Sequence, residues 1–162
     1  MTKKRLGMIT IEEIKRDFTF IEALTGNSEC YMNSETFEGH GNFCDIYFDS
    51  TNKELLQSQV DVFNKFKKDS KKYVTEIEEF ISKNLSSTKS EKLKEISKAD
   101  LIFEVIQIPQ DKMKYDLVLI CGKTYRQFLF FKKKISFRVE IKSGQIFSIK
   151  RKGKWESLND NE

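Results

Sequence analysis

The longest regular pattern of hydrophobic and polar residues lies between residues 52 and 85. Hydrophobic residues recur there at spacings of mostly three and four positions, which is typical of one buried stripe on an α-helix. The stripe consists of Leu56, Val60, Phe63, Phe66, Val74, Ile77, Ile81 and Leu85. Thr51 and Glu54 match a capping box, which predicts the start of the helix. The stripe lapses over residues 67–72, where Ser70 takes the inward position, so the helix either bends there or projects beyond the sheet.

Two shorter segments also have helical features. Thr88 and Glu91 form a second capping-box pattern, which predicts a short helix over residues 89–98. Residues 9–14 are amphipathic, and their pattern fits a helical turn and an edge strand equally well.

Before the long helix, short hydrophobic segments alternate with clusters of turn-forming residues. The predicted strands cover residues 18–21, 30–32 and 43–48, and turn clusters rich in Gly, Asn and Ser separate them. Such short spacings predict antiparallel neighbours in the N-terminal third of the chain.

The C-terminal half contains a second series of predicted strands. Residues 101–108 are hydrophobic on both faces, which is typical of a central strand covered on both sides. Further strands are predicted at 115–121, 125–131, 135–141 and 145–150, with Lys132–Lys134 as a junction between two of them. From residue 135 to 141 every second residue is hydrophobic, which indicates a sheet with one packed and one solvated face.

Together these elements predict an α+β fold, in which an antiparallel β-meander sheet packs against one long helix plus a short helix. We expect roughly six to eight strands in a single domain over residues 1–162, with frayed ends at 1–17 and 156–162. One core of this size is ample for stability. The helix is expected to bury Leu56, Val60, Phe63, Ile77 and Ile81 against Ile135, Phe137, Val139 and Ile141.

Charge is distributed very unevenly along the 162 residues, although the net charge is only +4. Residues 121–155 contain eleven Lys or Arg and one acidic residue, Glu140, so this segment carries +10 and the rest of the chain −6. Such a local positive field attracts phosphates or acidic protein surfaces.

Three interpretations of this basic segment stay open. The first is a solvated face, because Lys on strands prevents sheet edges from pairing. The second is an acidic protein partner, and the third is nucleic acid, since the aromatic residues Tyr125, Phe128, Phe130 and Trp155 are interleaved with the basic ones. The candidate partner-binding residues are Arg126, Lys132, Lys133, Lys134, Arg138, Lys150, Arg151 and Lys152.

The sequence nominates no catalytic, cofactor-binding or metal-binding residues. His40 is the single histidine, and with Cys44 nearby it lacks a recognisable catalytic motif. The three cysteines, Cys30, Cys44 and Cys121, fit neither a disulfide framework nor a zinc site. Gln59 is interpreted as an amide at the surface or boundary of the long helix. With no membrane-spanning run, signal peptide or phosphate-binding glycine loop, we expect a cytoplasmic, non-enzymatic protein without cofactors or a membrane partner.

The order of several motifs resembles a group of small bacterial proteins. The matching residues are Tyr31, Phe37-Glu38-Gly39, Ile46–Asp49, Gln59, Phe63, Phe66, Ile77 and Ile81, within roughly residues 18–150. That group has no assigned function, and some relatives are immunity proteins beside toxins. The resemblance implies a protein-binding, immunity-type function, with nucleic-acid binding as the alternative. Members often carry an acidic-His-Gly step where this chain has Phe131–Lys134, and many immunity proteins are acidic rather than basic.

Overall fold

The computed structural model describes residues 7–22, 29–36, 43–86, 99–111, 114–128 and 131–151, with backbone alone for 84–86, 126–128 and 131–133. The elements are α1 (Ile11–Asp17), β1 (Thr19–Ile21), β2 (Cys30–Thr36), β3 (Phe43–Asp49), α2 (Gln57–Ser86), β4 (Leu101–Ile108), β5 (Leu117–Phe128), β6 (Phe131–Lys142) and β7 (Gln145–Arg151). The predicted helix 89–98 lies outside the described residues. Helix α1 resolves the open choice at residues 9–14, and its capping box is formed by Thr10 and Glu13.

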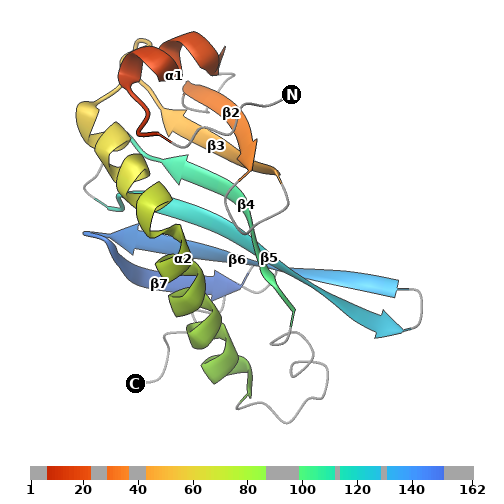
Figure 1. Cartoon of the computed structure of the whole chain (residues 1–162). Coiled ribbons are helices and arrows are strands. Elements are labelled where there is room, and N and C mark those ends of the chain that lie inside the picture. Colours follow the sequence, from red (N-terminus) through yellow and green to blue (C-terminus); the bar gives the residue numbers. More distant parts are fainter. Residues whose placement is uncertain are drawn as a thin grey trace.

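All seven strands form one sheet, in which they follow one another in chain order (Figure 1). The predicted α+β class is therefore confirmed. The prediction of a purely antiparallel meander is wrong at one pair, because β3 and β4 run parallel while the other neighbours are antiparallel. Parallel neighbours need a long crossover connection, and the segment that contains α2 provides it.

Helix α2 lies across one face of the sheet (Figure 1). The ring of Phe63 packs edge-on against Phe48 of β3, with centroids 5.3 Å apart, and Phe66 packs against Phe103 of β4 at 5.6 Å. The predicted helix residues Val60, Phe63, Ile77 and Ile81 and the predicted strand residues Ile135, Phe137, Val139 and Ile141 are all buried in one core cluster. The same cluster includes residues of α1 and of six strands from β2 to β7, so the described elements share one core.

The start of α2 differs from the prediction. Thr51 and Glu54 form an isolated β-bridge within a turn rather than a capping box. The helix begins five residues later than predicted, at Gln57, so Leu56 precedes it and is 44% exposed, while Leu55 is buried. The predicted burial of Leu56 is therefore wrong, because this residue lies before the helix and does not belong to its buried stripe.

Gln59 is completely buried and joins three elements, so its interpretation as a surface or boundary amide is wrong. Its side-chain oxygen accepts the N–H of Leu56 at 2.9 Å. Its side-chain nitrogen donates to the carbonyls of Asp49 at 2.8 Å and Ile108 at 3.1 Å, at the ends of β3 and β4. One amide thus fixes the first turn of α2 to both parallel strands.

The weak part of the hydrophobic stripe, residues 67–72, does not interrupt α2. Ser70 is buried, as its inward position predicts, and Tyr73 is buried one turn further on. The hydroxyl of Tyr73 donates to the carbonyl of Gly144 at 3.1 Å, so this part of the helix contacts the turn between β6 and β7.

The boundary between β5 and β6 also differs from the prediction. β5 continues to Phe128, which pairs with Phe131 of β6, so Lys132–Lys134 lie inside a strand rather than at a junction. β4 pairs with β5 only as far as Lys123. Residues 124–128 and 131–134 therefore form a two-stranded projection, here called the ribbon, at the right of Figure 1.

β4 is the central strand, as predicted, but the described residues place a helix over only one of its faces. On the face away from α2, Ile102 and Val105 are half-buried. Among the described residues, no second helical layer covers this side of β4.

Replacement of Gln59 tests whether its amide anchors the fold. We expect Gln59→Leu to lower the free energy of unfolding by roughly 2–4 kcal/mol, because one N–H and two carbonyls lose their partner inside the protein. The matched control is Gln57→Leu, at an exposed position in the same turn, where the amide donates to the carboxylate of Asp61. Urea unfolding measures the free energy of unfolding of both variants. If Gln57→Leu loses as much stability as Gln59→Leu, the amide of Gln59 does not anchor the fold.

Candidate partner-binding surface

The structure divides the predicted partner-binding residues into two groups. The sheet group contains Lys134, at the base of the ribbon, and Arg138 of β6 with Lys150 and Arg151 of β7, and Arg138 pairs with Lys150 in the register. The ribbon group contains Arg126, which pairs with Lys132, and Lys133, which pairs with Tyr125. Lys152 lies outside the described residues. The basic residues are thus neighbours in space as well as in sequence, but they lie in two different settings.

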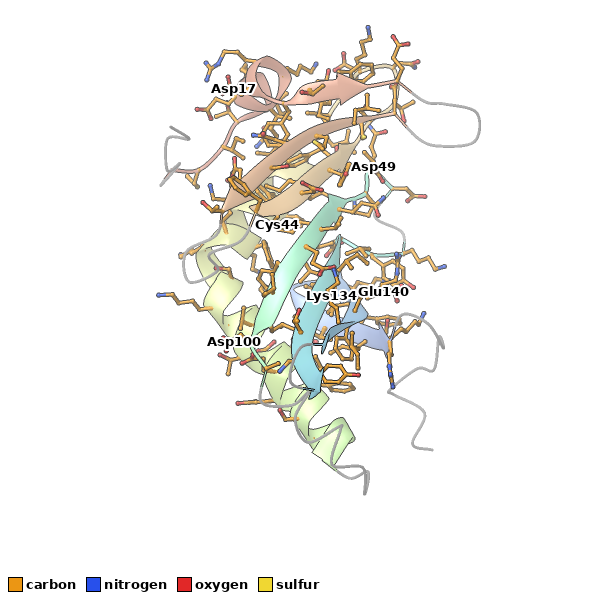
Figure 2. The ribbon with its side chains drawn as sticks, turned by 90° about the vertical axis from the view of Figure 1, so that its right-hand side faces the viewer. Asp17, Cys44, Asp49, Asp100, Lys134 and Glu140 are labelled. Atoms are coloured by element: carbon orange, nitrogen blue, oxygen red, sulfur yellow. The ribbon has the colours of Figure 1, made fainter. Side chains whose placement is uncertain are left out.

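The sheet group lies mainly on the face of the sheet opposite α2. Along β6 the buried core residues alternate with Lys134, Arg138 and Glu140, which therefore point the other way. Figure 2 shows Lys134 and Glu140 on the side of the sheet away from α2.

Glu140 forms ion pairs with two residues of the sheet group and is only 3% exposed. Its carboxylate lies 2.9 Å from Arg138 Nε and 3.6 Å from Lys150 Nζ. The hydroxyls of Ser148 and Tyr115 also donate to it. Two of the predicted partner-binding residues are therefore engaged in an internal ion-pair network.

The ionisation of Glu140 is strongly favoured. Burial alone raises the pKa of this carboxyl group, but the hydrogen bonds from Ser148, Arg138 and Tyr115 and the charge of Lys150 outweigh burial and lower the pKa to about 2. Glu140 is thus a buried anion at neutral pH, and it balances part of the positive charge of β6 and β7.

Lys134 forms a second ion pair across the sheet. Its ammonium lies 2.5 Å from the Glu104 carboxylate of β4, although β5 separates the two strands. The pair crosses β5 at Gly122, where an added Cβ would collide with the Glu104 carboxylate and lie 3.4 Å from Cδ of Lys134. The missing side chain of Gly122 provides the space for this ion pair.

The ribbon group has a different charge balance. Residues 124–134 contain Arg126, Lys132, Lys133 and Lys134 but no acidic residue. Lys134, at the base of the ribbon, forms an ion pair with Glu104 of β4. Strand β4 pairs with β5 no further than Lys123, so it does not pair with the ribbon. The two strands of the ribbon therefore provide no carboxylate of their own to balance Arg126, Lys132 and Lys133.

The three cysteines lie in the interior of the fold. Cys30, Cys44 and Cys121 are buried free thiols. Burial, followed by the charges of Asp45, Glu104 and Glu35, raises the pKa of Cys44 to about 12, so its thiol stays protonated at neutral pH. His40, the proposed neighbour, lies outside the described residues. Within the described ranges, no group of three or more His, Cys, Asp or Glu residues is suited to hold a metal ion.

Three further residues of the sheet group's polar contacts were not predicted from the sequence: Tyr115 and Ser148, which donate to Glu140, and Glu104, which forms an ion pair with Lys134. One signal was present in the sequence, because Glu140 is the single acidic residue within the basic segment. The other partners come from distant positions, and only the sheet register brings them together.

Comparison with protein-family models, curated proteins and solved structures gave no significant match. The resemblance to small bacterial immunity-like proteins therefore stays a prediction. No helix in the described part of the chain is long and apolar enough to cross a membrane. Evidence for what the basic surface binds therefore comes from the residues of this chain and not from known relatives.

The lowered pKa of Glu140 predicts a specific dependence of stability on pH. A carboxyl group with a folded-state pKa below its ordinary value of 4.5 stabilises the fold above that value, and this contribution is lost as the pH falls toward 2. We expect Glu140→Gln to lower the free energy of unfolding by roughly 2–4 kcal/mol at pH 7. The difference from wild type should shrink between about pH 5 and pH 2.

Denaturant unfolding at a series of pH values measures this difference. The control is Glu79→Gln, which removes the same charge from an exposed position of α2. A Glu140→Gln loss that stays constant down to pH 2 would show that the charge of Glu140 is not what stabilises the network.

Proposed function

We propose that this chain is a non-enzymatic cytoplasmic domain that binds an acidic protein surface through the ribbon. The observation that carries the proposal is the register of the ribbon, in which Arg126 lies opposite Lys132 with no acidic residue between positions 124 and 134. The basic residues nearest to it in the sheet have internal partners, since Lys134 contacts Glu104 and Arg138 contacts Glu140. An acidic partner supplies the carboxylates that the ribbon itself lacks.

The composition of the ribbon supports a protein as the partner. Phe128 and Phe131 accompany the basic residues in the sequence of the ribbon, and aromatic residues and Arg are enriched in the cores of protein interfaces. Residues 124–128 pair with β6 along one edge, and no described strand pairs with their other edge. An extended segment of a partner fits such an edge by adding a strand.

An immunity-type inhibitor is the more specific form of this proposal. It is supported by the resemblance of the motifs around Tyr31, Ile46–Asp49 and Gln59 to small bacterial immunity-like proteins. A basic ribbon suits a toxin with an acidic surface, in contrast to the acidic immunity proteins that bind basic nucleases. A toxin gene beside the gene for this chain would support this form of the proposal.

Nucleic-acid binding is the second candidate, and the shape of the ribbon favours it. A two-stranded β-ribbon fits the major groove of DNA, and the ribbon projects beyond β4 as such a structure. The interleaved aromatic and basic residues also suit single strands, whose bases stack on aromatic rings. Binding of this kind weakens steeply as salt rises.

Removal of three positive charges from the ribbon tests both candidates. We expect the combined variant Arg126→Ala, Lys132→Ala and Lys133→Ala to bind its protein partner at least about tenfold more weakly, since three charges at roughly 0.5–1 kcal/mol each exceed 1.4 kcal/mol. Lys134 is kept, so the ion pair to Glu104 stays intact.

The matched control removes Lys68, Lys71 and Lys72 from the exposed side of α2. Quantitative pull-down from lysate identifies proteins that wild type and control retain and the ribbon variant loses, and titration with the purified partner measures the affinity. Equal capture by the ribbon variant would remove the ribbon from the proposal. Salt-sensitive binding of oligonucleotides, lost in the same variant, would replace the protein partner with nucleic acid.

A further inference from the structure

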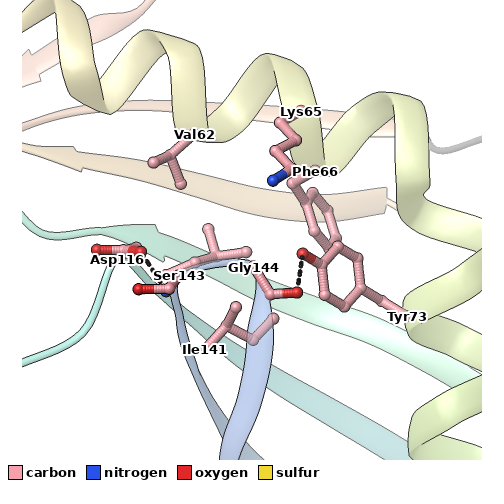
Figure 3. A pocket seen from close by; sticks show the side chains of 9 residues that line it. Val62, Lys65, Phe66, Tyr73, Asp116, Ile141, Ser143 and Gly144 are labelled. Carbon is pink, nitrogen blue, oxygen red and sulfur yellow. Dashed lines mark hydrogen bonds between the residues drawn. The ribbon is translucent and has the colours of Figure 1, made fainter.

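A cavity of about 210 Å³ lies between α2 and the turn that joins β6 to β7 (Figure 3). Its inner wall is hydrophobic and consists of the buried side chains of Phe66, Leu117 and Ile141, with half-buried Val62 above them. The volume corresponds to about seven waters, which suits a molecule of roughly ten non-hydrogen atoms. This cavity is separate from the ribbon and from the Glu140 network.

The turn beside the cavity is held in place from two sides. Ser143 and Gly144 both have positive φ, of 52° and 75°, which is typical of a two-residue hairpin turn. The Asp116 carboxylate accepts the N–H of Ser143 at 2.7 Å, and the Tyr73 hydroxyl donates to the carbonyl of Gly144 at 3.1 Å (Figure 3). The polar wall of the cavity is therefore already formed by groups that fix one another.

Two opposite charges face this cavity. The Lys65 side chain extends from α2 over the turn, and a Cβ on Gly144 would lie 3.1 Å from its ammonium nitrogen. No ion pair joins Lys65 to another residue in the described part of the chain. Figure 3 shows Lys65 and Asp116 on different sides of the Ser143–Gly144 turn, so a cation and an anion flank one hydrophobic wall.

We propose that this cavity binds a small zwitterion with an apolar body, namely a free apolar amino acid. Its carboxylate lies at Lys65 and its ammonium group at Asp116, whose second oxygen atom remains available. Its side chain packs against Phe66, Leu117 and Ile141. Charge complementarity favours this ligand class, because a ligand that carries only one of the two charges forms only one of the two ion pairs.

The test is a titration of the full-length chain with L-leucine, followed by two-dimensional amide NMR. We expect saturable shifts at residues 65, 143 and 144. Lys65→Met should weaken binding at least about tenfold, because it removes a charged hydrogen bond to the ligand. Asp116→Asn should do the same, while its amide oxygen still accepts the N–H of Ser143. The NMR spectrum of each variant also reports whether it is folded.

The matched control is Lys68→Met, which removes the same charge from an exposed position of α2 that does not line the cavity. It should bind leucine as wild type does. 4-Methylpentanoate and 3-methylbutylamine each lack one of the two charges and should bind more weakly than leucine. The proposal is overturned if wild type shows no shifts around the turn, if Lys65→Met retains wild-type affinity, or if either singly charged analogue binds as tightly as leucine.

Discussion

The fold depends on the buried side-chain amide of Gln59, which lies where the chain changes from antiparallel to parallel pairing. Two kinds of polar backbone groups meet there, the unpaired N–H groups at the start of α2 and the carbonyls at the ends of β3 and β4. Buried groups of this kind need partners. The amide oxygen of Gln59 accepts the N–H of Leu56, just before the helix, and its nitrogen donates to the carbonyls at the ends of both strands. The anchored helix then places Phe63 against Phe48 and Phe66 against Phe103.

A second constraint is electrostatic and acts on the face of the sheet opposite α2. Basic residues on neighbouring strands repel one another unless a carboxylate lies between them. Glu140 serves this role for Arg138 and Lys150, and Glu104 does so for Lys134 across the gap at Gly122. The positive charge that dominates residues 121–155 in sequence is therefore partly balanced in the fold.

The sequence predicts those features that depend on local pattern. The hydrophobic period of α2 correctly identifies Val60, Phe63, Ile77 and Ile81 as buried, and the bounds of β4 agree with its hydrophobic run. The parallel pairing of β3 with β4 was missed, because the edge to which a chain returns after a long helix is a non-local choice. The role of Gln59 was missed for the same reason, since its partners are strand ends brought together by that choice.

The candidate surface shows the same limit. The sequence identified the basic segment, but Lys132–Lys134 were predicted as a junction because a run of lysines interrupts the hydrophobic alternation. The backbone nevertheless continues as β6, since its pairing with β5 extends to Phe131. Contacts that involve distant residues such as Glu104 and Ser148 decide which lysines and arginines form ion pairs with a carboxylate. No local sequence pattern contains that information.

The separation of balanced and unbalanced charges bears directly on the proposed interaction. Within the sheet, Glu140 contacts Arg138 and Lys150 and Glu104 contacts Lys134, whereas each strand of the ribbon pairs with one described strand and neither ribbon strand contains an acidic residue. Like charges at directly opposed positions, such as Arg126 and Lys132, destabilise a strand pair. In the proposed complex, acidic groups of the partner lie next to these opposed basic positions.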